Sequence, residues 1–358
     1  MSTALPKLLQ LPWNAKIILS FVSPDLYALA KSANRRLEHI QWIFDDDDYQ
    51  FGTSIELAAT KETEEYTIKF PCAEEMENIR KECCDGEQYT KVFTKFTLQG
   101  TVYFLCTTQK YNQPQIVVDY GQPAKELQMK AMKLFSEHLW NLFSYEKTQL
   151  LFLSNDKISD CIIFDITKQF TWLDIENHDE CEPITRADIQ FLLETLKCDE
   201  IEFKPFVEDR VYFRPLTVKH ITMESARWLP IESLVKSESI SISICENSLE
   251  DDDLNMIVRA WMEGGLPNLQ CLTMSFEGSN PVHNRNGIFR GVWNTPFDAT
   301  NRPPYFQNSW QDWVRNEDAV DIKTNDGSLT ATVTLGRVHS RPGFGMFVWQ
   351  DTYNLRDD

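Results

Sequence analysis

The apolar positions of the first forty residues recur at helical spacing and predict three short helices. Pro12 suits the first position of a helix, because its missing N–H has no partner there, and an apolar face around Ile17 follows. Ser23-Pro24-Asp25 ends this helix and begins a second one through Leu29, and Arg35–Leu37 opens a third short element. A unit this small cannot close its own core, so we expect it to dock against something else.

Between residues 91 and 147 the apolar period changes. Residues 91–120 contain three runs rich in β-formers, separated by turn residues, and predict a three-stranded meander. Pro123 opens a long amphipathic helix through Leu142. We interpret His138 within this helix as a partly buried core histidine rather than a metal ligand.

Short strands alternate with helices over residues 148–358. Candidate strands begin near residues 200, 218, 240 and 269, and the clearest helix–strand unit spans Ser248–Met274, with Gly264-Gly265 ending its helix. The leucine spacing of its strand is typical of leucine-rich repeats, in which each strand and helix stack on their neighbours. We predict a leucine-rich-repeat-like domain, with an unrelated α/β layer carrying helices on one face as the alternative. Asn325-Asp326-Gly327 predicts that this domain ends in a β-hairpin.

Acidic residues dominate the charge of the chain, with 54 Asp and Glu against 35 Lys and Arg and a net charge of -19. Residues 41–90 contribute -10 of this total, so we interpret residues 44–90 as an acidic linker with little regular structure. Nucleic acids and anionic membranes attract basic surfaces, and we therefore expect neither as a partner. No apolar run reaches the length of a membrane span and no signal peptide is evident, which favours a cytoplasmic or nuclear protein.

The N-terminal segment resembles an F-box. A Leu-Pro pair, an isoleucine-rich helix, a Ser-Pro-Asp-Leu turn and a basic third segment carry this resemblance. It implies that residues 1–43 form an F-box, in which residues 5–40 bind the Skp adaptor, and through it a cullin, in SCF (Skp, cullin, F-box) ubiquitin ligases. The residues that the resemblance places at the adaptor interface are Leu11, Pro12, Ile17, Ile18, Leu26 and Leu29.

The C-terminal domain carries a second resemblance, to the F-box-associated type 2 domain of the large nematode F-box family. The segments that carry it are Val218–Ser225, Leu249–Asn255, Arg259–Gly264 and Leu266–Met274. The tail resembles the ends of those chains through Phe289-Arg-Gly291, Arg302-Pro303, Asp321–Gly327 and Phe347-Val-Trp349. Both resemblances together imply an α+β chain, with a three-helix F-box followed by a mixed strand/helix, leucine-rich-repeat-like domain. They imply the substrate-recognition subunit of an SCF-type E3 ubiquitin ligase, which holds an unknown target protein.

Motifs for catalysis are not evident in the sequence. It contains no GxSxG, P-loop, HExxH or GxGxxG pattern, and His178 with Cys181 lacks a second pair of zinc ligands. We therefore expect a non-catalytic receptor without metal or cofactor, in which partner proteins transfer the ubiquitin. Two alternatives stay open: an interaction scaffold that does not join a ligase, and a hydrolase whose catalytic groups meet only in the folded chain.

Two regions are candidates for binding the target protein. The proline-rich loop near residues 293–313 carries Trp293, Tyr305, Phe306 and Trp310, whose rings either close the end of a core or anchor a partner. Closing the core is the reading we favour for such rings, but as a target site we rank the loop above the strand face. That face, by alternation, holds outward Ser241, Ser243, Gln270, Thr273 and Ser275.

Overall fold

The computed structural model shows a mixed α/β chain dominated by β-strands, with helices between them. It divides into two compact units, Met1–His178 and Asp179–Asp358. The residues that the structure describes are 17, 20–21, 23–32, 36–45, 53–59, 65–71, 93–98, 101–110, 113–119, 125–153, 157–176, 184–205, 207, 214–225, 228–247, 249–276, 283–300, 302, 306, 319–338 and 341–349.

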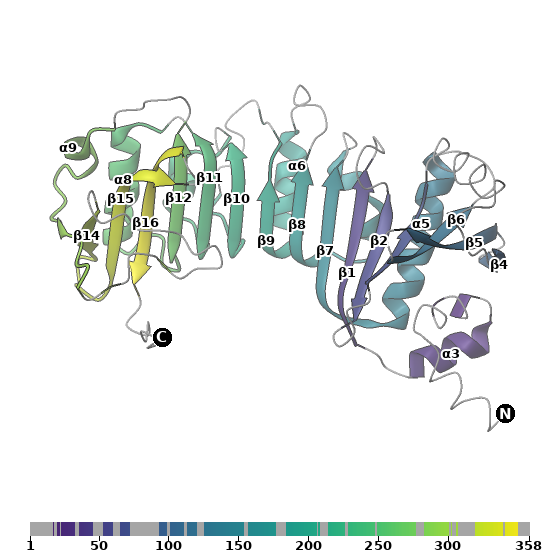
Figure 1. Ribbon diagram of the computed structural model, residues 1–358. Coiled ribbons are helices and arrows are strands. Elements are labelled where there is room, and N and C mark those ends of the chain that lie inside the picture. Colours follow the sequence, from purple (N-terminus) through teal and green to yellow (C-terminus); the bar gives the residue numbers. More distant parts are fainter. Residues whose placement is uncertain are drawn as a thin grey trace. The chain divides into compact units, whose positions relative to one another are not determined.

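The first unit is a mixed sheet whose strands lie in the order β8-β7-β1-β2-β3-β6-β5-β4 (Figure 1). Three neighbouring strands of this sheet are parallel to one another: β1 (Arg36–Asp45), β7 (Ser144–Leu153) and β8 (Gln169–Glu176). Strands β2 (Ser54–Ala59) and β3 (Glu65–Lys69) continue from β1 in antiparallel pairs, and β3 then runs parallel to β6 (Gln113–Asp119). The range predicted as a meander contains β4 (Phe93–Leu98), β5 (Thr101–Lys110) and β6, paired antiparallel.

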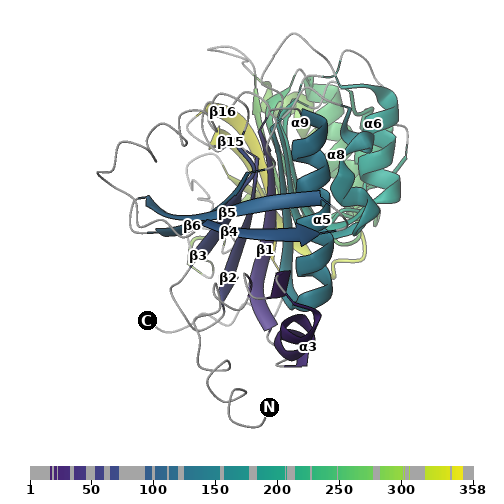
Figure 2. The same cartoon turned by 90° about the vertical axis from the view of Figure 1, so that its right-hand side faces the viewer.

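Helix α5 (Lys125–Leu142) covers one face of this sheet (Figure 2). It occupies the range where the sequence predicts a long amphipathic helix, and its buried side includes Phe135 and Leu139. Trp42 of β1 is fully buried beneath it and donates its ring N–H to Ser136 Oγ at 3.0 Å. This hydrogen bond satisfies an indole N–H that would otherwise be costly to bury. Two 3₁₀ turns, η1 (Ile158–Asp160) and η2 (Ile162–Asp165), connect β7 to β8.

The N-terminal part of this unit differs from the sequence prediction. The predicted third helix at Arg35–Leu37 is wrong, because Arg36 begins β1, and the predicted end of the F-box at residue 43 falls inside this strand. A register shift between Leu37 and His39 breaks the two-residue period of β1, which hides the strand in the sequence. The predicted linker over residues 44–90 contains β2 and β3, since short apolar alternations sit among its acidic residues.

Four parallel strands begin the second unit and lie beside one another in chain order (Figure 1). They are β9 (Lys197–Phe203), β10 (His220–Ser225), β11 (Ser241–Asn247) and β12 (Cys271–Phe276). Helical elements α6 (Arg186–Gln190), η3 (Phe191–Thr195), α7 (Ile231–Leu234) and α8 (Asp251–Met262) precede or connect them. Figure 2 shows α6 and α8 on one face of the sheet. Because the four strands are parallel, the chain returns to the same end of the sheet before each strand. The predicted domain boundary at residue 148 falls inside β7 of the first unit.

Helix α8 shows how local sequence places this layer. Glu250 and Asp253 form a reciprocal cap, three Asp side chains occupy the first turn, and Gly264 ends the helix at a φ of 87°. The buried side chains include Leu254, Ile257, Val258 and Trp261, which confirms the predicted inward face.

An antiparallel extension completes the second unit. Strand β16 (Arg341–Trp349) pairs with β12, and β15 (Thr330–Val338), β14 (Val320–Lys323) and β13 (Thr295–Pro296) follow outward. The predicted hairpin is present between β14 and β15, and Gly327 in its turn has a φ of 72°, a conformation that glycine adopts at low cost. Short helix α9 (Arg285–Ile288) lies between β12 and β13.

Candidate functional site

The N-terminal segment, here residues 17–32, is helical at each described position except Ser23 and lies against α5 of the same unit. Helix α3 (Pro24–Ser32) begins at the predicted proline, with the Asp25 N–H bonded to Ser23 Oγ at 3.3 Å. None of the residues of α3 is buried, and Leu26 and Leu29 are half-exposed. Its apolar side therefore keeps surface that a partner could cover.

Three side chains of the segment contact α5: those of Ser20, Phe21 and Tyr27. His138 Nε2 lies 2.8 Å from Ser20 Oγ. The ring centroid of His138 is 3.9 Å from that of Phe21 and 4.9 Å from that of Tyr27. Phe21 also contacts Phe135 of α5, with ring centroids 4.5 Å apart. Burial lowers the pKa of His138 to about 4, so the ring is neutral near pH 7. The prediction of a partly buried core histidine is confirmed.

The second unit presents a sheet face opposite its helices, and in-register residues form a row across that face. Strand pairing aligns Glu200, His220, Ser241 and Cys271, and then Phe347, Thr332 and Asp321. Their neighbours along the strands, such as Ile242 and Leu272, are buried toward the helical side. The same face therefore has a polar beginning on β9–β11 and an aromatic end on β16.

The described residues 297–300, 302 and 306, here the strap, cover the aromatic end of the face. Phe306 is 0 % exposed and packs on Phe347 and Trp349, with ring centroids 5.3 and 5.4 Å away. Cys271 and Ala319 belong to the same buried cluster. The strap thus makes a second small core on the side of the sheet away from α8.

A partly buried ion pair joins the strap to the sheet. Arg302 Nη1 donates to Asp321 Oδ1 at 2.6 Å, and the guanidinium lies 5.7 Å from the ring of Trp349. Thr332 Oγ1 donates to the same carboxylate oxygen at 2.7 Å and accepts the ring N–H of Trp349 at 2.7 Å. Since each polar group in this network has a partner, the strap is held in one position.

The polar beginning of the face, here the open face, consists of the outward residues of β9, β10 and β11. These side chains are half-buried or exposed, and they are Glu200, Glu202, His220, Thr222, Glu224, Ser241 and Ser243. Three of them are carboxylates, and the ammonium of Lys204 lies 3.5 Å from the carboxylate of Glu202. The open face is therefore hydroxyl-rich and acidic.

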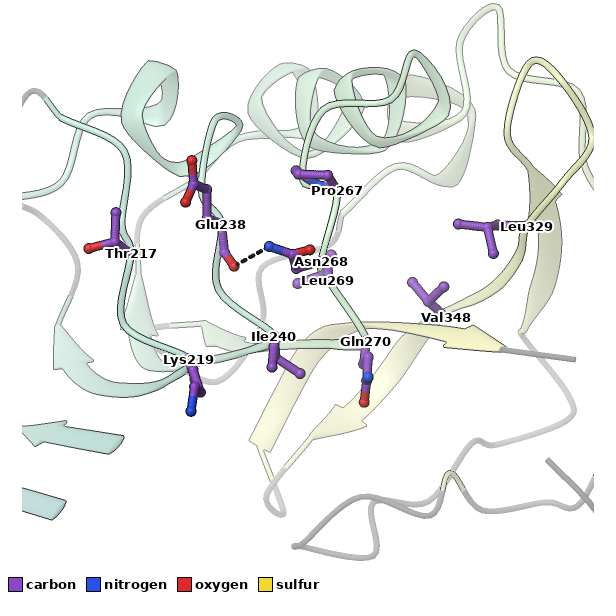
Figure 3. A pocket seen from close by; sticks show the side chains of 10 residues that line it. All are labelled: Thr217, Lys219, Glu238, Ile240, Pro267, Asn268, Leu269, Gln270, Leu329 and Val348. Carbon is purple, nitrogen blue, oxygen red and sulfur yellow. Dashed lines mark hydrogen bonds between the residues drawn. The ribbon is translucent and has the colours of Figure 1, made fainter. Parts of the chain in front are cut away.

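A pocket of about 470 Å³ lies where β10, β11 and β12 begin (Figure 3). Figure 3 shows Lys219, Ile240 and Gln270 side by side and pointing the same way, one from each strand start. Main-chain hydrogen bonds link the three positions, from Ile240 N to Lys219 O at 2.7 Å and from Gln270 N to Ile240 O at 2.8 Å. Asn268 Nδ2 bridges to the main-chain oxygen of Glu238 at 3.0 Å. Leu269, Leu329 and Val348 add apolar walls, a mixture that suits a protein side chain.

Residues 213–274 match the family model described as F-box associated. This F-box-associated segment contains β10, β11, α7, α8 and the first four residues of β12, and therefore most of the open face and of the pocket. No curated protein and no solved structure matched the chain. Among the helices that the structure describes, none is both long enough and apolar enough to cross a bilayer.

The predicted adaptor-binding residues divide into three groups. Ile17 is fully buried, so its side chain has no free surface in this conformation, whereas Leu26 and Leu29 keep part of theirs. Leu11, Pro12 and Ile18 lie outside the described residues.

The predicted target-binding residues divide in a similar way. Trp293 is 69 % exposed, which leaves its ring available to a partner. Phe306 is a core residue, and we correct its predicted role because a ring with no exposed surface cannot contact a target. Tyr305 and Trp310 lie outside the described residues.

The strand face also needs one correction. Thr273 and Ser275 of β12 are buried, although alternation predicts them to be outward, because both faces of this strand are covered. Sequence reasoning missed Glu200 and Glu202, whose alternation with buried Ile201 and Phe203 is a signal that could have found them.

Proposed function

We propose that this chain is the substrate-recognition subunit of an SCF-type ubiquitin ligase. In this proposal the N-terminal segment binds the Skp adaptor, the second unit binds a target protein, and partner proteins carry out ubiquitin transfer. The chain itself acts by proximity, since holding the target beside the charged enzyme raises the effective concentration of its lysines. The observation that carries the proposal is the F-box-associated match over residues 213–274.

Two features of the structure support the two binding roles. Helix α3 keeps Leu26 and Leu29 half-exposed, although both are apolar, and the F-box resemblance assigns both to the adaptor. The F-box-associated segment supplies β10 and β11 of the open face, which no described helix covers.

We place the target on the open face rather than on the proline-rich loop, which reverses the ranking drawn from the sequence. The reason is that Phe306 is fully buried in the small core of the strap, while the outward residues of β9–β11 keep exposed surface. The three carboxylates Glu200, Glu202 and Glu224 favour a target segment that carries Lys or Arg, because complementary charge speeds association and selects partners.

Co-purification with the Skp adaptor tests the adaptor role. We expect wild-type protein to retain the adaptor and Leu26→Asp/Leu29→Asp to lose it, because two carboxylates would be desolvated at the interface. Met256→Asp is the matched control, since Met256 is also a partly exposed apolar residue on a helix but lies in the second unit. Equal retention by the double variant, or no retention by wild type, would contradict the proposal.

Cross-linking and affinity capture from cells test the target surface. Leu26→Asp/Leu29→Asp serves as the bait, because a receptor uncoupled from its ligase holds its target without degrading it. Adding Glu200→Lys and Glu224→Lys should remove the captured protein, whereas Glu232→Lys and Glu263→Lys, which reverse two exposed carboxylates elsewhere in the unit, should not. Equal capture by both charge variants would rule out the open face.

The second candidate function is an interaction scaffold that does not join a ligase. The complete burial of Ile17 favours it, because an F-box-like segment absorbed into a scaffold has no need of an exposed isoleucine. The two functions differ in whether a cullin accompanies the chain. Quantitative mass spectrometry of the wild-type capture should find a cullin for the receptor and none for the scaffold.

A further inference from the structure

Ile17 has two incompatible uses in the proposed receptor. The F-box resemblance assigns it to the adaptor, yet the structure buries it completely within the first unit. One turn later Phe21 is also buried and stacks on His138 of α5. A side chain with no exposed surface cannot contact an adaptor, so the N-terminal segment must rearrange before Ile17 reaches one.

We propose that the contact of Ser20, Phe21 and Tyr27 with α5 is an autoinhibitory latch, which keeps Ile17 buried until these residues leave α5. This inference rests on the proposed adaptor role of the segment. The closed form is the one in the structure, and the open form exposes Ile17 together with Phe21. The adaptor binds the open form, so its apparent affinity is reduced by the fraction of molecules that are closed.

The hydroxyl of Ser20 makes two hydrogen bonds in the latch. The hydroxyl of Ser20 donates its single proton to the main-chain oxygen of Ile17 at 2.6 Å. It must therefore accept from His138, which places the imidazole proton on Nε2, 2.8 Å away. Serine and histidine thus form one directed chain of hydrogen bonds from α5 to the helix that carries Ile17.

The latch is small enough to open without unfolding the sheet. Among the described residues of the segment, those that are buried are Ile17, Ser20 and Phe21, and α3 buries none. Segments with few buried contacts open at a lower free energy than the core to which they are attached. The half-exposed Leu26 and Leu29 of α3 offer an adaptor a first contact before the segment releases.

A pair of serine variants separates the latch from general stability. Ser20→Ala removes the hydrogen bond to His138, and Ser136→Ala removes the hydrogen bond that Trp42 makes to the same helix. Each change deletes one buried hydroxyl that pairs with an aromatic ring nitrogen, but Ser136 is bonded to β1 of the sheet rather than to the segment. His138→Ala is a stronger second variant of the latch.

Hydrogen exchange and adaptor affinity are measured on full-length protein with purified Skp adaptor. We expect Ser20→Ala to speed exchange of residues 17–32 and to tighten adaptor binding about fivefold, which is the effect of one net hydrogen bond. His138→Ala should tighten binding more than Ser20→Ala, and Ser136→Ala should leave both readouts at wild-type values.

Faster exchange with unchanged or weaker adaptor binding would overturn the latch, because the contact would then be structural only. Unchanged exchange in both latch variants would overturn it as well. If no variant and no wild-type protein binds the adaptor, the proposed function fails, and the autoinhibitory role fails with it. The exchange data would then still report whether His138 holds the segment on α5.

Discussion

Replacing Phe306 by Ala is the sharpest test of how the strap is built. The ring is fully buried and contacts two other aromatic rings, those of Phe347 and Trp349. Removing a buried phenylalanine leaves a cavity that the surroundings fill only in part, and such changes cost about 3 to 5 kcal/mol. Because this core is small, we expect a loss of about 4 kcal/mol from the free energy of unfolding of the second unit.

Urea unfolding followed by circular dichroism measures this loss, and hydrogen exchange locates it. Two units can unfold in separate steps, so the midpoint assigned to the second unit is the quantity to compare. Exchange should become faster in β14, β15 and β16, which the strap covers or adjoins, and should stay unchanged in β1 and β7 of the first unit.

Trp293→Ala is the matched control, because this ring belongs to the same predicted set of aromatic residues but is 69 % exposed. We expect its effect on the free energy of unfolding to stay within about 0.5 kcal/mol. A cost below about 1 kcal/mol for Phe306→Ala, accompanied by loss of captured target, would refute the reasoning and return Phe306 to a binding surface.

Three further predictions follow from buried groups. The pKa of His138 is about 4 in the folded protein, against 6.5 in the unfolded chain. The contribution of this shift to the free energy of unfolding is therefore complete above pH 6.5 and is lost as the pH falls toward 4. The shift corresponds to about 3 kcal/mol. Urea titrations at pH 7 and pH 4 should show that the free energy of unfolding falls by that much less in His138→Gln than in wild type, and an equal fall in both proteins would contradict a neutral His138. Gly345→Ala should destabilise the second unit by about 1 to 3 kcal/mol, because the added methyl would lie 2.8 Å from the ring of Phe347, and an unchanged melting temperature would show that the ring moves aside. Asp321→Asn should cost about 3 kcal/mol by leaving Arg302 without its buried carboxylate; urea unfolding checks this, and a cost near zero would mean that the pair contributes nothing to the strap.

Local patterns were sufficient for much of the second unit. The limits of α8 follow from its acidic cap and from Gly264, and its buried face follows from apolar spacing, all of which lie within one short stretch of sequence. The turn at Gly327 and the strands around it are similarly local. These features could be predicted because the residues that cause them are neighbours in the chain.

The strand β1 shows where local pattern fails within an element. Leu37, Ile40 and Trp42 are all buried, but the register shift after Leu37 removes the regular alternation that identifies a strand. Pairing with β7, more than a hundred residues later, makes the segment a strand. The helix predicted at Arg35–Leu37 does not form, because this segment pairs with β7 far along the chain.

The candidate sites depended on the tertiary structure in the same way. The sequence by itself determined that Ile17, Phe306 and Trp293 belong to apolar or aromatic stretches. Only the fold decided that α5 lies against the first segment, that the strap closes over β16, and that Trp293 stays exposed. The physical reason is that the hydrophobic effect is non-directional: a pattern shows that a face must leave water, while which surface covers it depends on contacts between residues far apart in the chain.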